Sequence, residues 1–481
     1  MIAPLHPGRP HVVVVGGGIT GLCAAHRLIR SANGWPIDVT LFESSDRLGG
    51  KLLTVGVGGV RVEAGADSFV VRKPWAVELC KELGLGGELV VPAATGAFVW
   101  TRGRLVPLPP RSAFGIPSSA IDMLRWPGLS LRGRLRAATE FLHRVKRSDQ
   151  DESIGSLLAR RMGHEATRVL SGPLLAGLHA GDPDRLSVRA TFPELVTWEQ
   201  GHDSLIRGAR AALEAADRQD QRRAIFTTVW GGLSRLVDTL ENSIAAMRIR
   251  RGEPVLELRP AGNGYLVKTS GSQIRADTVV LTTPAFEAAR LLQPWAPEAA
   301  RELGGIAYAS TATVTLVYPE GSGGRLPQGS GFVVPQGERT ITACTWLSRK
   351  WPQEDDANRA VVRCFVGRAG DEAPLRMPDE DLIATVRSEA ERAAPMPAAP
   401  DAVHLARWER AMPQYEVGHL DRLARIDTAI TASPGVFLAG SAYRGVGIAD
   451  CVRQGEEAAV RVREFLESRP APSEPLEREV R

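Results

Sequence analysis

Cysteine is scarce in this sequence. The 481 residues include only Cys23, Cys80, Cys344, Cys364 and Cys451. No two of them stand in a C-x-x-C arrangement, which argues against a zinc ribbon or a dithiol redox site. Their odd number and wide spacing are typical of reduced, buried thiols, so we expect a cytoplasmic protein.

Long apolar runs and a dominant charge are also missing. No stretch of about 20 apolar residues occurs, so we expect no transmembrane segment. The first ten residues lack the apolar core of a signal peptide. The 59 basic and 55 acidic residues are scattered and give a net charge of +4. Because a nucleic-acid partner needs clustered basic residues, none is expected. The nine histidines show no metal-ligand spacing, so no metal is expected either.

One segment mixes apolar residues with arginine. Residues 114–142 have the composition of an interfacial helix. A helix that lines a cavity would give the same pattern, and we favour that interpretation. Peripheral membrane contact therefore stays open at this point, as does the oligomeric state, monomer or homodimer.

The N-terminal region contains a clear βαβ pattern. Residues 12–15 are four consecutive valines, as expected for a strand buried on both faces of a parallel sheet. Glycines follow at once, and residues 22–29 then repeat apolar side chains at helical spacing. A second apolar strand, residues 39–42, ends at Glu43. This order predicts a mononucleotide-binding unit.

The glycine loop between these elements fits G-x-G-x-x-G. It comprises Gly16, Gly17, Gly18, Ile19, Thr20 and Gly21. The first glycine permits a tight turn, the second lets the backbone approach a pyrophosphate, and the third allows close packing of helix on sheet. The helix N-terminus then attracts the phosphates. Glu43 is placed to accept hydrogen bonds from ribose hydroxyls, which argues against NADP.

Two further segments favour FAD over NAD. The first follows Glu43 and contains Ser44, Arg47, Gly50 and Lys51, and it resembles the extended fingerprint of the amine-oxidase-like flavoproteins. Its two basic side chains are expected to reach phosphate oxygens. The second follows an apolar strand at 435–440 and contains Val446, Gly447 and Ile448. A helix that starts there would direct its positive end at the flavin ring and stabilise the reduced flavin.

Longer strings identify a narrower family. The segments AGDPDRLS (180–187) and RWERAMPQYEVGH (407–419) are far more specific than a dinucleotide motif. With EAGADSF (63–69) and YRGVGIADC (443–451), they resemble the protoporphyrinogen and coproporphyrinogen oxidase family, closest to its bacterial members with MPQY. The resemblance covers residues 12–465. It implies FAD-dependent, oxygen-utilising oxidation of coproporphyrinogen III to coproporphyrin III in haem biosynthesis, and it leaves protoporphyrinogen IX open as a substrate.

The resemblance also implies site residues. It assigns further flavin contacts to Gly65, Ala66, Asp67, Ser68, Val255 and Trp408. Val255 would meet the adenine through its backbone, and Trp408 would pack near the isoalloxazine. No catalytic side chain is implied, because the flavin N5 accepts the hydride.

Fewer features of the sequence indicate which residues contact the substrate. Eukaryotic members carry an arginine for a substrate propionate in the strand 96–100, where this sequence has Ala97. Arg72 and Lys73 are the nearest basic candidates, and Lys73 matches a lysine of the bacterial branch. The apolar stretch 172–177, with Leu174, Leu175 and Gly177, is our candidate for one wall of the substrate cavity.

Two other functions remain open. The first is an amine oxidase or a carotenoid-type desaturase on the same fold. Covalent-flavin amine oxidases carry a cysteine just before the terminal glycine turn, where this chain has Ser441, Ala442 and Tyr443, so we expect non-covalent FAD. The second is a flavin-containing scaffold without activity.

The fold class expected is α/β. We expect a discontinuous Rossmann-like FAD-binding domain, an α+β substrate domain and a mainly helical domain that covers the active site. The FAD-binding domain is expected to comprise residues 10–72, 230–300 and 425–466. The substrate domain is expected over residues 73–95 and 301–424, and the helical domain over residues 96–229. Residues 467–481 are expected to form a disordered tail.

Overall fold

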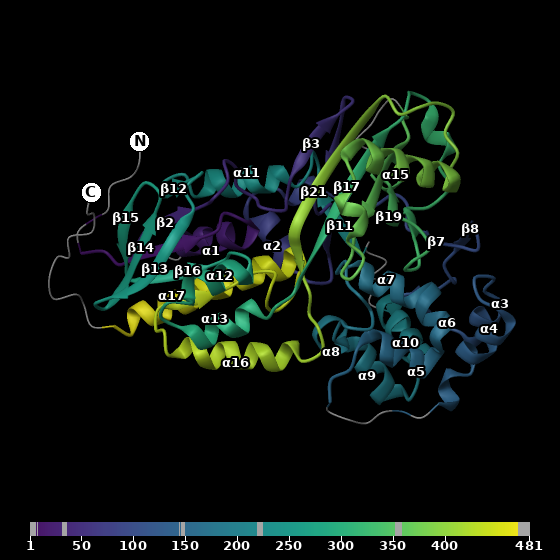
Figure 1. Ribbon diagram of the computed structural model, residues 1–481, viewed down its shortest axis with the longest axis horizontal. Coiled ribbons are helices and arrows are strands. Elements are labelled where there is room, and N and C mark those ends of the chain that lie inside the picture. Colours follow the sequence, from purple (N-terminus) through teal and green to yellow (C-terminus); the bar gives the residue numbers. More distant parts are fainter. Residues whose placement is uncertain are drawn as a thin grey trace.

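The protein is described by a computed structural model that covers residues 6, 8–30, 36–143, 145, 150–218, 225–351 and 358–469. Figure 1 shows three regions. A parallel sheet with its helices lies at one end, a larger and mostly antiparallel sheet lies beside it, and a group of short helices lies below that second sheet. The predicted α/β class with these three parts is confirmed.

The first region is a five-stranded parallel sheet. Its order is β12-β2-β1-β16-β22. The strands come from distant parts of the chain, so the domain is discontinuous as predicted. They are β1 (His11–Val15), β2 (Asp38–Phe42), β12 (Arg248–Arg250), β16 (Thr278–Leu281) and β22 (Val436–Leu438). β1 is fully buried because both faces of the sheet are covered.

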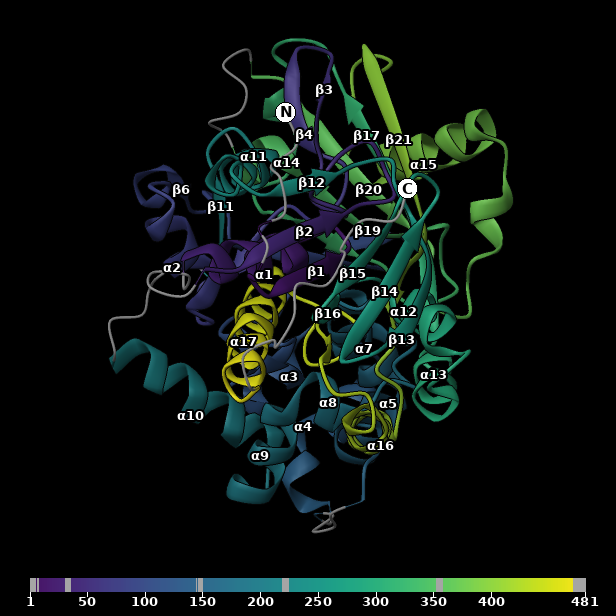
Figure 2. The ribbon, with the colours of Figure 1, turned by 90° about the vertical axis from the view of Figure 1, so that its left-hand side faces the viewer.

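One face of this sheet carries helices. α1 and α17 pack against each other there, as the side view in Figure 2 shows. The apolar cluster on this face joins four helices: α1 (Ile19–Arg30), α2 (Trp75–Glu82), α11 (Ser234–Ser243) and α17 (Ile448–Glu467). We predicted that 73–95 belongs to the substrate domain, but α2 packs into the core of the first region, so that assignment is wrong for α2.

The opposite face is covered by a small sheet and three helices. The sheet is β13 (Val255–Ala261), β14 (Gly264–Thr269) and β15 (Gln273–Ala276). The helices are α12 (Ala285–Leu292), α13 (Pro297–Gly304) and α16 (His419–Thr431). Their apolar side chains form one cluster with β1 and β16.

The second region is a seven-stranded sheet. Its strands, in spatial order, are β21 (Ala402–Pro413), β17 (Tyr308–Val317), β20 (Val361–Val366), β19 (Ile341–Trp346), β18 (Gly331–Val333), β7 (Ala97–Thr101) and β8 (Arg104–Pro107). Helix α15 (Asp379–Ala393) packs on it through Leu382 and Val386. Since β7 pairs in parallel with β18, residues 97–107 belong to this sheet and not to the helical part predicted over 96–229.

Short elements connect these regions. β3 (Thr54–Val57) and β4 (Val60–Glu63) form a hairpin, and β11 (Phe226–Val229) pairs with β5 (Phe69–Val70) and β6 (Leu89–Val90). Single turns of helix and two short strands complete the set: η1 (Gly86–Glu88), β9 (Ser112–Ala113), β10 (Ile116–Pro117), η4 (Ser322–Arg325), α14 (Leu347–Lys350) and η6 (Ala373–Arg376). β9 and β10 pair with each other in antiparallel orientation.

The third region is helical and has its own apolar core. Its elements are α3 (Ala120–Arg125), α4 (Leu131–Ala138), η2 (Glu140–Leu142), α5 (Ile154–Met162), α6 (His164–Ala166), the π-helix η3 (Thr167–Ser171), α7 (Gly172–Gly177), α8 (Val188–Thr191), α9 (Pro193–His202) and α10 (Leu205–Arg218). The surface helix or loop predicted over 209–224 lies partly outside the described residues. So does most of the tail predicted to be disordered, since description stops at residue 469.

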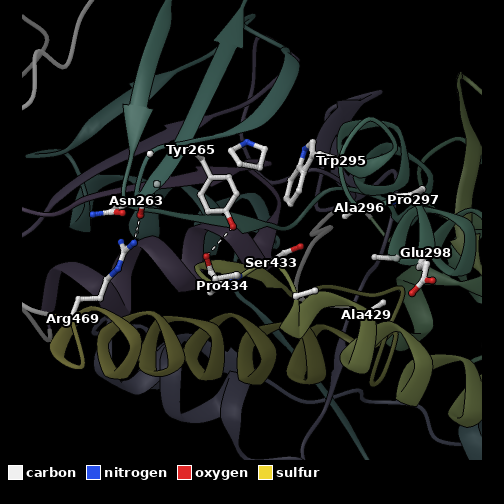
Figure 3. A pocket seen from close by; sticks show the side chains of 15 residues that line it. Asn263, Tyr265, Trp295, Ala296, Pro297, Glu298, Ala429, Ser433, Pro434 and Arg469 are labelled. Carbon is white, nitrogen blue, oxygen red and sulfur yellow. Dashed lines mark hydrogen bonds between the residues drawn. The ribbon is translucent and has the colours of Figure 1, made fainter.

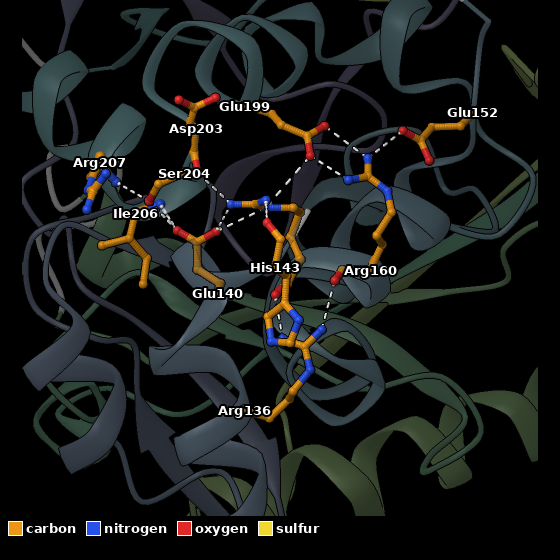
Figure 4. A network of polar contacts seen from close by, with 11 residues as sticks. Arg136, Glu140, His143, Glu152, Arg160, Glu199, Asp203, Ser204, Ile206 and Arg207 are labelled. Carbon is orange, nitrogen blue, oxygen red and sulfur yellow. Dashed lines mark hydrogen bonds and ion pairs between the residues drawn. The ribbon is translucent and has the colours of Figure 1, made fainter. Parts of the chain in front are cut away.

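A buried network of ion pairs connects side chains from several elements of the helical region (Figure 4). Arg161 and Glu140 are fully buried and meet at 2.6 Å. Glu199 lies 3.7 Å from Arg161 and binds Arg160, which also contacts Glu152 at 2.8 Å. Hydrogen bonds to backbone atoms complete the network, so the buried charges are compensated.

Candidate active site

The glycine loop leaves β1 through a tight turn. Gly16 has φ +108°, and its N–H donates to the carbonyl of Phe42. A Cβ on Gly21 would lie 1.9 Å from the carbonyl oxygen of Gly16, so no larger residue fits at position 21. A Cβ on Gly18 would meet nothing within 4 Å, so the loop is open at this position. Helix α1 begins at Ile19, directly behind this opening.

Glu43 lies against the loop. Its Oε2 accepts the N–H of Gly17 at 2.7 Å. Its Oε1 accepts the N–H and the hydroxyl of Ser45, both at 2.8 Å, and the hydroxyl of Ser44 at 3.2 Å. The carboxylate is thus fixed at the carboxyl end of β2, beside the start of α1. Thr20, also predicted in the site, is buried in the first turn of that helix.

The second glycine turn packs on the first. Gly49 donates to the carbonyl of Gly17 at 2.8 Å, and Gly18 and Gly49 form an isolated bridge. A Cβ on Gly50 would lie 3.3 Å from the Cα of Gly18. Gly49 and Gly50 have φ +97° and +57°, a backbone conformation that favours glycine at both positions.

The two basic residues of this turn bind protein oxygens. Arg47 donates to the carbonyls of Leu48 at 3.2 Å and Leu52 at 3.3 Å, and also to that of Gly50. Lys51 donates to the carbonyl of Ala411 on β21, and burial lowers its pKa. We predicted that both side chains reach phosphate oxygens. In this structure they hold the turn and join it to the second sheet, and a contact with phosphate stays a prediction.

The segment after β4 is anchored by two cations. Asp67 binds Arg363 at 2.8 Å and Lys350 at 3.0 Å, and it accepts the hydroxyl of Ser68 at 2.7 Å. Burial alone would raise the pKa of Asp67, but the charges of Lys350 and Arg363 outweigh it and hold that pKa well below its usual value.

The backbone of the same segment is held as tightly. Arg363 donates to the carbonyls of Glu63 at 2.8 Å and Gly65 at 3.2 Å. Trp408 donates to the carbonyl of Ala64 at 2.9 Å, and its ring would lie 3.2 Å from a Cβ on Gly65. Sequence reasoning missed Arg363. The sequence feature that could have indicated Arg363 is a single charged residue in an otherwise apolar strand, VVRCFV.

The neighbouring Ala66 is placed by Lys51. The N–H of Ala66 points to the carbonyl of Lys51 at 3.4 Å, and a Cβ on Gly65 would lie 2.1 Å from the same oxygen. The structure therefore brings the 47–51 turn and the 63–68 segment together, although the sequence separates them by a hairpin.

A small cavity of about 40 Å³ lies beside this segment, lined in part by Glu63, Asp67 and Trp351. The Oε2 of Glu63 and the indole N–H of Trp351 are buried there and have no hydrogen-bond partner. Burial raises the pKa of Glu63 to about 7, although Leu233 and Thr54 donate to its other oxygen.

The start of α17 forms another wall. Gly447 precedes Ile448, the first helical residue, and the turn includes Val446. Gly445 has φ +118°, and its N–H donates to the hydroxyl of Tyr415 at 2.9 Å. The helix runs from Ile448 to Glu467.

Lys73 lies at this helix. Its ammonium group binds both carboxylate oxygens of the buried Asp450, at 2.6 and 2.8 Å. Arg72 points elsewhere and pairs with Glu194 at 2.7 Å on the surface. The structure thus separates the two candidate propionate ligands, and only Lys73 lies beside the residues expected near the flavin.

Two histidines form an aromatic group near Lys73. The ring of His419 stacks on Tyr415 with 4.0 Å between centroids, and His179 lies 5.9 Å from the same tyrosine. Burial lowers the pKa of both histidines to about 4; the charge of Lys73 adds to the effect at His179. Both rings are therefore neutral near pH 7. In the described parts of the chain, no group of side chains could hold a metal ion.

One predicted wall residue of the substrate cavity is corrected by the structure, and the predicted contact of Val255 stays a prediction. Leu175 is fully buried in the helical core, because α7 turns this side inward, so it lines no cavity. Leu174 is half-buried against Gly115, and only Gly177 is exposed with open space beside it. Val255 is also buried, and its carbonyl accepts a hydrogen bond from Arg290 at 2.8 Å. Its backbone oxygen is thus already bonded within the protein.

A larger cavity lies away from all these residues. It has a volume of about 580 Å³ and lies between the β13–β14 turn, α13 and the end of α17. Figure 3 shows Tyr265 and Trp295 in its wall, with the tyrosine hydroxyl bonded to the carbonyl of Pro434. None of the predicted site residues lines it.

The arrangement fits a dinucleotide. The open position at Gly18 lets a pyrophosphate approach the N-terminus of α1, and the carboxylate of Glu43 stands beside it for ribose hydroxyls. The 63–68 segment and the start of α17 then flank the space next to it. No helix in the described residues combines the length and apolarity needed to span a bilayer.

Comparison with known proteins agrees with this fit. Residues 19–463 match the family described as "Flavin containing amine oxidoreductase". Two similar curated proteins are the coproporphyrinogen III oxidases of Bacillus subtilis (36% identity, 94% of this chain and 97% of that protein) and Staphylococcus aureus (30% identity, 94% and 98%).

Solved structures show the same relationship. A crystal structure from Exiguobacterium sp. 255-15, provisionally named a protoporphyrinogen oxidase, matches with a TM-score of 0.85 and 33% identity over 95% of this chain and 99% of that one. Cyclohexylamine oxidase of Brevibacterium oxydans matches with a TM-score of 0.69 but 16% identity, which shows the fold alone. The chain therefore belongs to the flavin containing amine oxidoreductase family and, within it, to the coproporphyrinogen III and protoporphyrinogen oxidases, and it is an FAD-dependent oxidoreductase.

Proposed function

We propose that this protein oxidises coproporphyrinogen III to coproporphyrin III in haem biosynthesis, with dioxygen as the electron acceptor and hydrogen peroxide as the second product. The observation that carries the proposal is the 36% identity to the B. subtilis coproporphyrinogen III oxidase over nearly the whole of both chains. The paired glycine turns and the carboxylate beside them support the same conclusion, since they fit the cofactor that this chemistry needs.

The overall reaction removes six electrons and six protons from the substrate, as three two-electron oxidations. FAD, when bound, supplies the two-electron acceptor for each of them. The protein then has to bind the cofactor, hold a large flat substrate beside it and keep water away.

The cofactor contacts remain part of the proposal. We assign direct contact with FAD to Gly16, Gly17, Gly18, Ile19, Thr20, Gly21, Glu43, Ser44, Gly65, Ala66, Asp67, Ser68, Trp408, Val446, Gly447 and Ile448. Arg47, Gly50 and Lys51 shape the turn behind the pyrophosphate, since their contacts lie within the protein. The Val255 amide can still face the adenine.

Lys73 is our proposed contact for a substrate propionate. Its side chain is 37% exposed, and its partner Asp450 is buried at the start of α17. An incoming carboxylate can bind the exposed side of the ammonium group while Asp450 holds the other side. Leu174 and Gly177 remain candidates for the wall of the substrate cavity. Ala97 lies on β7, and its methyl group offers no charge to a propionate.

A cytoplasmic location is also part of the proposal. The five cysteines are all buried and unpaired, which supports a reducing compartment.

The test is direct. Purified protein loaded with FAD should convert non-fluorescent coproporphyrinogen III into fluorescent coproporphyrin III, and one product should appear for three dioxygen molecules consumed. The ratio of kcat/KM for coproporphyrinogen III to that for protoporphyrinogen IX measures the preference. Turnover of a primary amine without turnover of either porphyrinogen would overturn the proposal in favour of an amine oxidase.

A further inference from the structure

Arg368 is a buried arginine without a partner for its charge. It lies two residues after the end of β20 and is 8% exposed. Its Nε and Nη2 atoms are both buried and have no hydrogen-bond partner in the part of the chain that the structure describes. Two other buried arginines differ in this respect, since Arg363 and Arg161 bind carboxylates at 2.8 and 2.6 Å.

A buried charge of this kind is costly unless it is paired. Burial lowers the pKa of Arg368, and the carboxylates of Asp371 and Asp182 offset that effect only in part. Both acids are half-buried, so the guanidinium lies just below the surface rather than deep in a core. Its Nε–H and Nη2 groups share one edge of the planar guanidinium, and such an edge binds both oxygens of a carboxylate.

Arg368 lies beside the turn that follows α7. The N–H of the next residue, Ala369, donates to the carbonyl of Ala180 at 2.8 Å. Ala180 has φ +46°, a left-handed conformation that is unusual for alanine, and backbone strain of this kind is concentrated at functional sites. The N–H of Ala180 donates in turn to the carbonyl of Gly177 at 3.2 Å. Gly177 is the exposed residue proposed for the wall of the substrate cavity, so one residue of the turn joins that wall to the arginine's loop.

The same turn contains His179, which lies near Lys73. The charge of Lys73 contributes to the low pKa of His179, and Gln414 donates to the carbonyl of His179 at 3.0 Å. Lys73 and Arg368 therefore both lie near the segment 177–182. Six residues span at most about 20 Å even when fully extended. Two cations along such a segment can bind two carboxylates of one large ring.

We propose that Arg368 binds a propionate of the substrate and that this contact favours coproporphyrinogen III over protoporphyrinogen IX. The proposal rests on the function proposed above. Coproporphyrinogen III carries one propionate on each of its four pyrroles, whereas protoporphyrinogen IX carries two, on neighbouring pyrroles. A ring with four propionates presents one to Lys73 and a second to Arg368. A ring with two adjacent propionates leaves Arg368 unpaired when Lys73 is bound.

The variant Arg368→Met separates this role from a structural one. It removes a buried charge that has no partner, so the melting temperature of the FAD-loaded protein should stay the same or rise. The value of kcat/KM for coproporphyrinogen III should fall about tenfold to a hundredfold, and that for protoporphyrinogen IX less than about threefold. The dissociation constant of coproporphyrin III, measured by fluorescence titration without turnover, should rise at least about tenfold.

The matched control is Arg376→Met, which removes an exposed arginine on η6 and should leave all three quantities unchanged. Arg368→Lys keeps the charge without the paired donors, so it should restore only part of the affinity for coproporphyrin III. Equal losses on the two porphyrinogens would overturn the proposal. So would a lower melting temperature of Arg368→Met with an unchanged dissociation constant, because the arginine would then be structural.

Failure of the proposed function gives a different result. The unchanged protein would then oxidise neither porphyrinogen, although it binds FAD. If the unchanged protein oxidises coproporphyrinogen III and Arg368→Met does so equally well, the function stands and the assignment of Arg368 is wrong.

Discussion

The carboxylate of Glu43 accepts a hydrogen bond from the backbone N–H of Gly17 at 2.7 Å. This contact joins the end of β2 to the glycine loop, so bonds within the protein hold the acidic residue in place beside the loop. The second carboxylate oxygen is held by Ser45. Such preorganisation reduces the ordering that binding would otherwise require.

Glu43→Ala should weaken FAD binding by about tenfold to a hundredfold, because hydrogen bonds to a charged group contribute about 1.5–3 kcal/mol. Flavin fluorescence titration of the apoprotein measures the dissociation constant. The control is Asp46→Asn, which changes an exposed acid in the same turn and should leave the constant unchanged. An equal effect of both variants would refute a specific role for Glu43.

The two glycines of the loop should respond differently to alanine. Gly21→Ala should lower the stability of the apoprotein by about 1–3 kcal/mol, because its methyl group would overlap the carbonyl of Gly16. Gly18→Ala should leave the apoprotein as stable as before, since nothing lies within 4 Å, but should weaken FAD binding. Melting temperature and FAD titration of both variants separate the effects. A Gly18→Ala protein with unchanged FAD affinity would mean that the pyrophosphate does not approach this position.

Lys73→Ala should raise KM for coproporphyrinogen III several-fold, by about 1 kcal/mol or more of lost binding, and should lower kcat less. Steady-state kinetics with saturating FAD provides both constants. Arg72→Ala is the matched control, because Arg72 pairs with Glu194 at the surface and should leave KM unchanged. If Arg72→Ala raises KM and Lys73→Ala does not, the assignment is reversed.

Arg161→Met should destabilise the protein by about 3–5 kcal/mol, because it leaves Glu140 buried without its partner. Urea unfolding measures the change. Arg111→Met, which removes a surface pair with Asp217, should cost no more than about 1 kcal/mol. A loss for Arg161→Met as small as for Arg111→Met would show that the buried network (Figure 4) contributes little.

Acid should destabilise the protein partly through His179. Its pKa in the folded state is about 4, below the ordinary value of 6.5, because burial disfavours the charged form. The unfolded chain therefore binds more protons between pH 6.5 and 4, and stability falls as pH falls through this window. At pH 5 the loss from this group is about 2 kcal/mol relative to pH 7. Urea unfolding at the two values measures it.

His179→Phe should reduce that loss, since phenylalanine cannot take up a proton and the pocket already holds Phe192 and Tyr415. The control is His164→Phe at an exposed position, which should leave the pH dependence as it was. If the free energy of unfolding of His179→Phe falls between pH 7 and pH 5 as much as that of the unchanged protein, His179 does not contribute to the acid response.

Much of the cofactor region could be predicted because its signals are local. The run of valines, the glycines behind it and Glu43 specify a strand, a turn and an acid within 33 residues, and the structure confirms these elements. The strings around 180–187 and 407–419 led to the family, which the comparisons confirm.

Assignments that depend on packing were less successful. β7 belongs to the seven-stranded sheet, although helices follow it in sequence, because it pairs with β18 more than 200 residues away. Arg47 and Lys51 bind backbone carbonyls rather than an open space, and Leu175 faces the helical core. Arg363 gave only a weak signal, and its contacts with Asp67 and Gly65 join segments some 300 positions apart.

The sequence by itself determined the cofactor class, the family and the local elements of the glycine loop, because each depends on residues that are close along the chain. Only the tertiary structure decided which cations bind protein atoms, that Lys73 rather than Arg72 lies beside α17, and that apolar residues of α3 and α4 face outward. The physical reason is that a charge or an apolar side chain is defined by its surroundings. Those surroundings come from strands and helices that are distant in sequence and adjacent only in the fold.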